Sequence, residues 1–263
     1  MKTMWKGALN FGLVNVPVKM HTATEKKSIK FKYLHKDCYA PVEYKRICSA
    51  CKKEISWDEI IKGYEYEPGR YVEIDEKELE NIPDEKSKTI DILDFVDLKE
   101  IDPVYYDKTY YLSPQETGER AYLLLKKALE DNSKVAICKV IIRSKESLAC
   151  VRVYNDVLTL ETMFYPDEVR DVGDITSSQS NVKVHDKELE MANKLIENLT
   201  SDFDPDKYKD NYREALLELI RIKIEGKEIK TPKVEKEDKV VDLMEALKES
   251  VKMVEEEEDQ RTG

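Results

Sequence analysis

Three consecutive runs of β-branched and apolar residues constrain the fold of this chain most: Val135–Arg143, Ser147–Tyr154 and Val157–Tyr165. Asn155-Asp156, which separates the second run from the third, is typical of a two-residue hairpin turn. The three runs therefore predict an antiparallel meander. Meanders of this kind close into sheets or barrels.

Further strands are expected before the meander, and helices after it. The strand-like runs end at Gly, Pro or polar residues, and they are Ala8–Val14, Val16–Thr22, Ile29–Leu34, Val42–Ile47, Ile90–Leu98 and Val104–Leu112. Ser113 and Pro114 are suitable N-cap and first residues for a helix that continues to about Leu129.

The pattern after Pro166 has the period of a helix. One amphipathic helix is predicted to start near Asp186, and a second runs from Asp204-Pro205 to about Gly226. The charged, Pro-containing stretch 227–238 is expected to be a linker. It precedes a short helix whose apolar stripe either docks on its own core or binds a partner, and the stripe consists of Val240, Met244, Leu247, Val251 and Val254.

Length and composition exclude several classes of protein. The chain has 263 residues, of which 41% are hydrophobic and 38% charged, enough for one large domain with or without an appendage. The absence of any run of about 18 apolar residues predicts no transmembrane helix, and Met1–Asn10 lacks a secretory signal. Five cysteines, an odd number, argue against a secreted disulfide framework. We therefore expect a reducing cytoplasmic location.

Positive charge is concentrated in two segments of a chain whose net charge is −11. Residues 1–53 carry +9 and residues 120–152 carry +5, while residues 54–119 between them carry −13. A local positive surface on an acidic protein attracts phosphate where the rest of the molecule repels it. If the charge has a purpose, the fold brings the two basic segments together.

Four potential metal ligands lie within the first basic segment: His35, Cys38, Cys48 and Cys51. Their H-x2-C-x9-C-x2-C spacing suits one structural, closed zinc site, and the alternatives are a redox-active CxxC pair or a set of free thiols. The sequence has no Walker A loop, GxGxxG or HExxH motif, so we expect no enzyme activity.

Short stretches spread over almost the whole chain resemble the bacterial Ku family in the same order. They are Trp5–Ala8, Phe11–Lys19, Ala23–Glu25, Tyr44–Cys48, Lys62–Tyr66, Ile101–Pro103, Tyr165–Arg170, Asp210–Tyr212 and Val240–Leu247. The resemblance implies an α+β fold, in which an antiparallel β-barrel core carries a bridge insertion and a helical C-terminal arm. It also implies a homodimeric ring around a broken DNA end that recruits and stimulates an ATP-dependent ligase in non-homologous end joining.

This resemblance divides the chain into a core, residues 1–230, and a linker with a partner-binding helix, residues 231–263. It also places the protein on the nucleoid. A protein that binds any break contacts phosphate and sugar rather than base edges. The candidate contacts are Lys19, Lys27, Lys30, Lys36, Lys45, Arg46, Arg143, Lys145 and Arg152. The alternative function is a zinc-ribbon adaptor or a transcription-associated DNA-binding protein without end specificity.

Overall fold

The computed structural model describes residues 1–79, 88–142, 145–173, 184–226 and 243–262. The chain divides into two units, Met1–Asp171 and Val172–Gly263. The sequence-based boundary near residue 230 lies outside the described residues, so it stays a prediction. Among the described residues, no helix is both long and apolar enough to cross a membrane.

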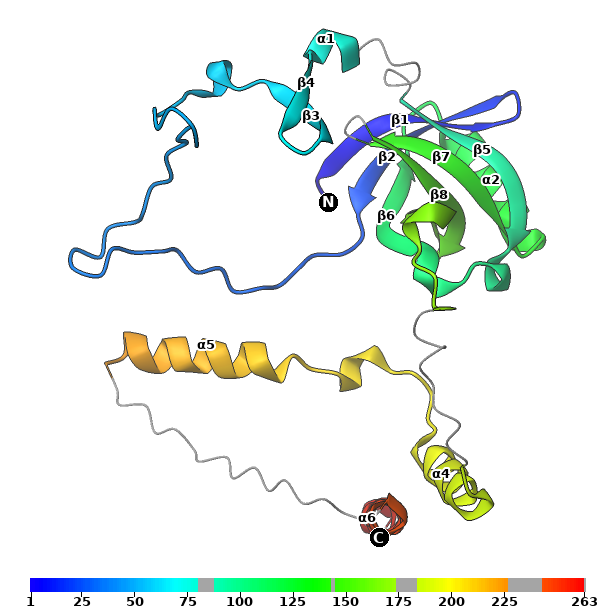
Figure 1. Cartoon of the computed structure of the whole chain (residues 1–263). Helices are drawn as coiled ribbons and strands as arrows, with labels where there is room; N and C mark the ends of the chain where they lie inside the picture. Colours follow the sequence, from blue (N-terminus) through cyan, green and yellow to red (C-terminus); the bar gives the residue numbers. More distant parts are fainter. Residues whose placement is uncertain (80–87, 143–144, 174–183, 227–242, 263) are drawn as a thin grey trace. The chain divides into compact units, whose positions relative to one another are not determined.

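The first unit contains a closed seven-stranded barrel in the order β1-β2-β6-β9-β8-β7-β5 (Figure 1). Neighbouring strands are antiparallel except at the closure, where β1 pairs with β5 in parallel over Ala8 to Asn10. The strands are β1 Thr3–Phe11, β2 Val14–Thr22, β5 Thr89–Asp97, β6 Tyr106–Pro114, β7 Lys134–Ile142, β8 Lys145–Tyr154 and β9 Val157–Met163.

The predicted meander is confirmed as β7, β8 and β9, paired in succession. Asn155 and Asp156 both have positive φ, at 44° and 69°, as expected for a tight hairpin turn between right-twisted strands. The α+β barrel architecture is therefore confirmed. The meander is its best-predicted part, because the Asn155-Asp156 turn signals it locally in the sequence.

The barrel core is built from alternate residues of each strand, because successive side chains point to opposite faces. Leu9, Val18, Leu112, Val140 and Leu160 are fully or almost fully buried inside it. Helix α2, Glu119–Asp131, adds three more side chains to the same core: Tyr122, Leu125 and Leu129. Burial of apolar area contributes about 25 cal/mol per Å², so this shared core holds helix and barrel together.

The start of α2 differs from the prediction. The helix begins at Glu119 with Gly118 as N-cap, because Ser113 and Pro114 belong to β6 and pair with β2. Gly118 is required there, since a Cβ at this position would meet the carbonyl oxygen of Pro17 at 2.6 Å. The connection is held by Gln115, whose side-chain amide donates to the carbonyls of Gly7 and Val18, each at 3.0 Å.

A long insertion, residues 23–88, leaves the barrel after β2 and returns at β5 (Figure 1). The strands predicted over Ile29–Leu34 and Val42–Ile47 do not form; instead, isolated bridges join Leu34 to Pro41 and Ile47 to Glu54. The insertion also contains the two-stranded sheet β3–β4, which was not predicted. Its elements are η1 Trp57–Glu59, β3 Lys62–Glu67, β4 Arg70–Ile74 and α1 Glu76–Leu79.

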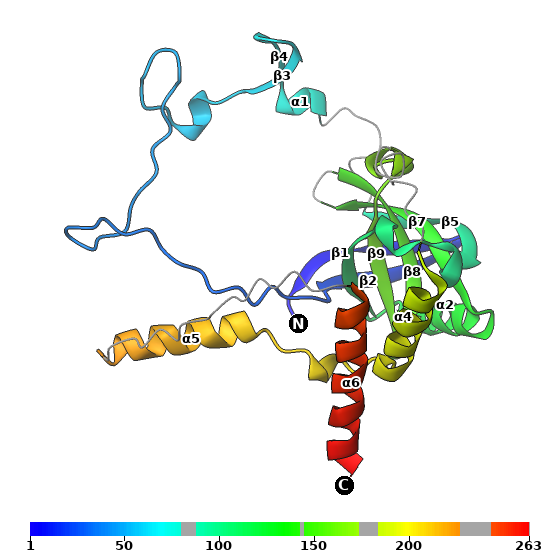
Figure 2. The same cartoon turned by 60° about the horizontal axis from the view of Figure 1, so that its bottom comes forward.

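The second unit is helical, as predicted. Helix α4, Asp186–Leu199, begins at the predicted residue, whereas α5, Asn211–Ile224, begins later because Pro205–Lys207 forms a separate 3-10 turn. Helix α6, Leu243–Thr262, packs against α4 (Figure 2). Three short 3-10 turns complete the first unit: η2 Leu98–Glu100, η3 Pro103–Tyr105 and η4 Pro166–Glu168.

Candidate nucleic-acid interface

The His/Cys cluster lies in two small turns of the insertion. In the first, residues 34–41 (knuckle A), the His35 amide donates to the Ala40 carbonyl at 2.9 Å and the Tyr39 amide donates to the His35 carbonyl at 2.8 Å. Tyr39 has a positive φ of 56°, which reverses the chain. His35 Nδ1 lies 3.1 Å from Cys38 Sγ, so the two potential ligands already face each other.

The second turn, residues 47–54 (knuckle B), repeats this geometry. The Cys48 amide donates to the Lys53 carbonyl at 2.9 Å, the Lys52 amide donates to the Cys48 carbonyl at 3.0 Å, and Lys52 has a φ of 58°. Each residue corresponds to one in knuckle A thirteen positions earlier, so that Cys48 matches His35 and Cys51 matches Cys38. The two turns are therefore local repeats with a ligand pair at i and i+3.

The thiol of Cys48 is chemically distinct from the buried cysteines. Hydrogen bonds from the backbone of Cys51 and Ala50, together with the Cys51 side chain, lower the pKa of Cys48. Burial raises the pKa of Cys138 and brings that of Cys150 to about 12. Metal ions bind the thiolate form of cysteine. An accessible thiol with a lowered pKa is therefore suited to binding metal, whereas the buried thiols are inert.

Two ligand pairs of this kind fit zinc, which prefers imidazole and thiolate in a closed tetrahedral site. Within the described ranges, however, no group of three or more His, Cys, Asp or Glu side chains is positioned to hold an ion. A zinc site would therefore need knuckles A and B to come together, and the zinc site stays a prediction.

Lys19 lies on the outer face of the barrel, because its neighbours Val18 and Met20 are fully buried inside. The β1–β2 register places Lys6 directly opposite it. The sequence analysis missed Lys6, since the first strand was predicted to start only at Ala8. A longer strand there would have paired the two lysines across the hairpin.

The predicted basic residues of the insertion are exposed. Lys27 pairs with Glu25 at 2.7 Å, and Lys45 pairs with Glu54 at 2.8 Å. Exposed ion pairs of this kind contribute roughly 0–1 kcal/mol, so exchange of the carboxylate for a phosphate costs little. Lys30 and Lys36 are also exposed, and the guanidinium carbon of Arg46 lies 3.9 Å from the centroid of the Trp57 ring.

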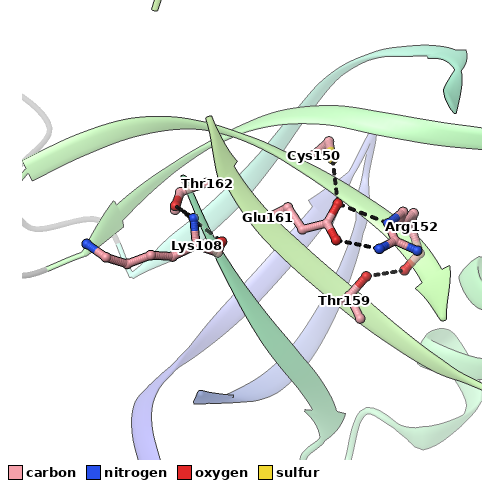
Figure 3. Close-up of polar contacts among 6 residues, drawn as sticks. All are labelled: Lys108, Cys150, Arg152, Thr159, Glu161 and Thr162. Carbon is pink, nitrogen blue, oxygen red and sulfur yellow. Dashed lines mark hydrogen bonds and ion pairs between the residues drawn. The ribbon is translucent and has the colours of Figure 1, made fainter. Parts of the chain in front are cut away.

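The basic residues of β8 have a different environment. Arg152 donates from Nε and Nη2 to the two carboxylate oxygens of Glu161, at 2.9 and 2.5 Å (Figure 3). The Glu161 side chain is only 8% exposed, and its hydrogen bond and charge raise the pKa of Arg152. A phosphate contact by Arg152 would break this pair. Lys145 lies 3.6 Å from Glu168, and Arg143 lies outside the described residues.

Figure 3 also shows how β6 keeps its register beside this ion pair. The ladder between β6 and β9 is irregular between Tyr106 and Lys108. At this irregularity the Thr162 hydroxyl accepts from the Lys108 amide at 3.1 Å and contacts the Lys108 carbonyl at 3.3 Å (Figure 3). The Thr162 side chain therefore bridges β6 and β9 where the ladder between them is irregular.

The stripe predicted to bind a partner lies partly on α6. Met244 and Leu247 are half-buried and Val251 is buried, while α6 packs against α4. Val240 lies outside the described residues, and nothing is described of the Val254 side chain. The chain itself therefore covers part of the stripe, and its role in ligase binding stays a prediction.

Comparison with known proteins decides the family. The family model described as the Ku70/Ku80 beta-barrel domain matches residues 10–191, which include every strand of the barrel in whole or in part.

The chain belongs to the Ku family.

Ku relatives match almost the entire chain. A protein of Desulfitobacterium hafniense named "Non-homologous end joining protein Ku" is 48% identical over 264 residues, covering 100% of this chain and 92% of the relative. Proteins of the same name from Heliobacterium modesticaldum and Bacillus subtilis are 45% and 44% identical, over 97% and 95% of this chain and 92% and 82% of their own lengths. The similarity therefore extends from the barrel through the insertion to the helices.

Proposed function

We propose that this protein binds the ends of broken duplex DNA without sequence preference and acts in non-homologous end joining. The observation that carries the proposal is the 48% identity to a Ku protein of that name over the full length of the chain. Because the similarity includes the insertion and the helical unit, it supports the same role for the whole chain and not only for the barrel.

The architecture is compatible with a ring. Residues 23–88 form an insertion between two barrel strands, and a second copy related by a two-fold axis supplies a second insertion. Two barrels with two insertions enclose more space than one small barrel can. We therefore propose a homodimeric ring through which the duplex passes, entering from a free end.

Charge explains why such a ring holds DNA without reading its sequence. Residues 1–53 carry +9 in a chain of net charge −11, so phosphate is attracted to this segment and repelled elsewhere. Lysine and arginine contacts to phosphate carry no sequence information. We propose Lys6 and Lys19 on the barrel, with Lys27, Lys30, Lys36, Lys45 and Arg46 on the insertion, as the main contacts.

A structural zinc ion is proposed for the insertion. His35 and Cys38 from knuckle A and Cys48 and Cys51 from knuckle B would hold it, fixing two turns that otherwise form separately. The ion would serve to order the insertion, with no role in a reaction. We also propose that α6 recruits an ATP-dependent ligase, with Met244, Leu247 and Val251 forming the apolar stripe.

The test is competition between DNA forms of one sequence. Labelled linear duplex bound to the protein is challenged with unlabelled linear, doubly hairpin-capped or covalently closed circular duplex. A threaded ring predicts that linear DNA competes at least about tenfold better than circular DNA, and that occupancy rises stepwise with duplex length. Equal competition by the circle would contradict end binding and favour the adaptor or transcription-associated alternative.

A further inference from the structure

The insertion exposes an unusual amount of aromatic surface around its two turns. In residues 29–57, called the knuckle segment, five large aromatic side chains are 67–80% exposed: Phe31, Tyr33, Tyr39, Tyr44 and Trp57. Single exposed apolar residues need no explanation, but a concentrated group marks an interaction site. The same segment carries seven Lys or Arg residues and three Asp or Glu residues. The surface therefore combines ring faces with positive charge.

The aromatic and basic residues follow the repeat of the two turns. Phe31-Lys32-Tyr33 precedes knuckle A, and Tyr44-Lys45-Arg46 precedes knuckle B at the same thirteen-residue spacing. The Tyr33 carbonyl accepts from the Val42 amide at 3.0 Å, as the Arg46 carbonyl accepts from the Ile55 amide at 2.9 Å. Each turn is thus preceded by a triplet of an aromatic residue, a lysine and a second planar side chain. The repetition indicates that the two triplets perform the same task.

Arg46, in the triplet before knuckle B, already stacks on an aromatic ring. The Arg46 guanidinium lies 3.9 Å from the Trp57 ring centroid, and Trp57 itself is 70% exposed. Trp57 is held at the start of η1, where the Ser56 amide and hydroxyl both donate to the Glu59 carboxylate, at 2.8 and 2.9 Å. A fixed tryptophan beside a guanidinium offers a flat, positively charged surface.

Flat rings interleaved with lysines match the chemistry of unpaired nucleotides. Every base has a π-face that can stack on an aromatic side chain, and this contact requires no particular sequence. In a duplex the base faces are already stacked on each other, so they are accessible only where the strand is single. The lysines beside the rings add the charge that the phosphates of such a strand require.

We propose that the knuckle segment binds the single-stranded tails of broken DNA ends, stacking bases on Tyr44 and Trp57 and contacting phosphates through the neighbouring lysines. The same contact by Phe31 and Tyr33 extends the path to knuckle A. The inference rests on the proposed binding of duplex ends and adds to it a second contact, specific for the unpaired part of the end.

The first test compares a blunt duplex with the same duplex carrying a ten-nucleotide oligo(dT) 3′ tail, in protein purified without chelator. The double variant Tyr44→Ala, Trp57→Ala is expected to bind the tailed duplex about tenfold or more weakly, because each stacked base contributes about 1–3 kcal/mol. Binding of the blunt duplex should change by less than about twofold. The wild-type preference for the tail therefore disappears in the variant.

Tyr71→Ala is the matched control. Tyr71 on β4 is 64% exposed, like the tyrosines of the knuckle segment, but it lies opposite Glu65, and its basic neighbour Arg70 pairs with Glu67 at 2.9 Å. Its removal is expected to leave both affinities unchanged. An equal loss of tail binding in this control would contradict the proposal, because exposed aromatic surface alone would then account for the effect.

The second test uses fluorescence. The chain has two tryptophans, and Trp5 packs against the barrel core, so Trp5→Phe leaves Trp57 as the only reporter. Oligo(dT) is expected to quench Trp57 emission and protect it from acrylamide, whereas a blunt duplex does neither. Trp57 emission that is shielded from acrylamide in the free protein would overturn the proposal, since the ring would then be covered by the protein itself.

The possible failures are distinguishable. If wild-type protein binds blunt ends but shows no preference for tails, the proposal is wrong and end binding stands. If it binds neither blunt nor tailed linear DNA better than circles, end binding itself is wrong. Loss of dimerisation in the Tyr44/Trp57 variant would assign the aromatic surface to contact between two copies and would also overturn the proposal.

Discussion

The hydroxyl of Tyr122 on α2 accepts a hydrogen bond from the amide of Leu158 on β9 at 2.8 Å. The same hydroxyl donates to the carbonyl of Leu112 on β6, also at 2.8 Å. One side chain thus satisfies a backbone donor and a backbone acceptor on two neighbouring strands of the barrel, and it does so from inside the core. Helix and barrel are therefore joined by polar contacts as well as by packing.

Tyr122→Phe should destabilise the barrel by about 1–3 kcal/mol, because it leaves two buried backbone groups without a partner. Urea denaturation followed by circular dichroism measures the change. Tyr154→Phe on β8, where the side chain is 44% exposed, is the control and should change stability by less than about 0.5 kcal/mol. Equal effects of the two substitutions would show that the Tyr122 hydroxyl is not important for stability.

The basic residues of the β1–β2 hairpin and those of β8 should differ in their contribution to DNA binding. Charge reversal of Lys6 and Lys19 together is expected to weaken all duplexes alike and to reduce the salt dependence of binding, because two phosphate contacts and their counterions are lost. Titrations of duplexes with different base compositions at several salt concentrations measure this. A change in sequence preference instead would imply direct contacts to base edges.

Arg152→Met tests a basic residue that we expect to contribute to stability rather than to DNA binding. Glu161 would lose the partner of a largely buried ion pair, so the free energy of unfolding should fall by about 2–4 kcal/mol. Under conditions in which the variant stays folded, its affinity for DNA should change little, since the guanidinium of Arg152 is bound to a carboxylate. The double variant with Glu161→Leu should recover much of the stability, because it also removes the unpaired carboxylate.

The part of the fold that sequence predicted well is the part with local signals. The Asn155-Asp156 turn specifies the β8–β9 register, and counting outward from this turn places Arg152 close to Glu161. That count was available from the sequence and would have separated Arg152 from the exposed lysines. Pro68-Gly69 is a comparable turn signal, and it could have revealed the β3–β4 hairpin.

Other features depend on contacts between distant residues. The parallel closure of β1 with β5 joins residues about eighty positions apart, and no local pattern specifies it. Ser113-Pro114 has the chemistry of a helix start, but pairing with β2 draws it into a strand. The ligand spacing of the cluster was evident, whereas the repeat of the two turns became visible only in their hydrogen bonds and positive φ angles.

Cys48 should be far more reactive than the buried thiols of the metal-free protein. Its pKa is lowered by hydrogen bonds from Cys51 and Ala50, so the thiolate forms at a lower pH than in an ordinary cysteine. Alkylation by iodoacetamide should therefore reach half its maximal rate below the usual thiol pKa, and mass spectrometry identifies the modified residue. Cys138 and Cys150, whose pKa values are raised by burial, should react only after unfolding. Equal rates at Cys48 and Cys138 would contradict this assignment.

Zinc binding is tested by metal content. Protein purified without chelator should contain about one zinc per chain, and Cys48→Ser or His35→Ala should release it because each removes one ligand of a four-ligand site. Zinc should also protect Cys48 from alkylation. Cys138→Ser, which changes a buried thiol of the barrel, is the control and should keep the metal. Metal-free wild-type protein would assign the four side chains to free thiols and a solvated histidine.

The last prediction concerns α6. This helix packs on α4, and Val251 is 4% exposed, yet both helices belong to a unit separate from the barrel. Deletion of residues 238–263 should therefore leave the thermal unfolding of the barrel and the binding of duplex ends unchanged. Stimulation of an ATP-dependent ligase should be lost, because the apolar stripe that we propose for its recruitment is gone.

A point substitution separates packing from recruitment within α6. Val251→Asp places a charge in the contact between the helices and should release α6, which limited proteolysis of the second unit detects. Lys248→Ala, on an exposed position of the same helix, should keep it in place. If Val251→Asp releases α6 but ligase stimulation persists, the stripe packs the second unit and does not bind the ligase. If the truncated chain fails to dimerise, the helix belongs to the subunit interface.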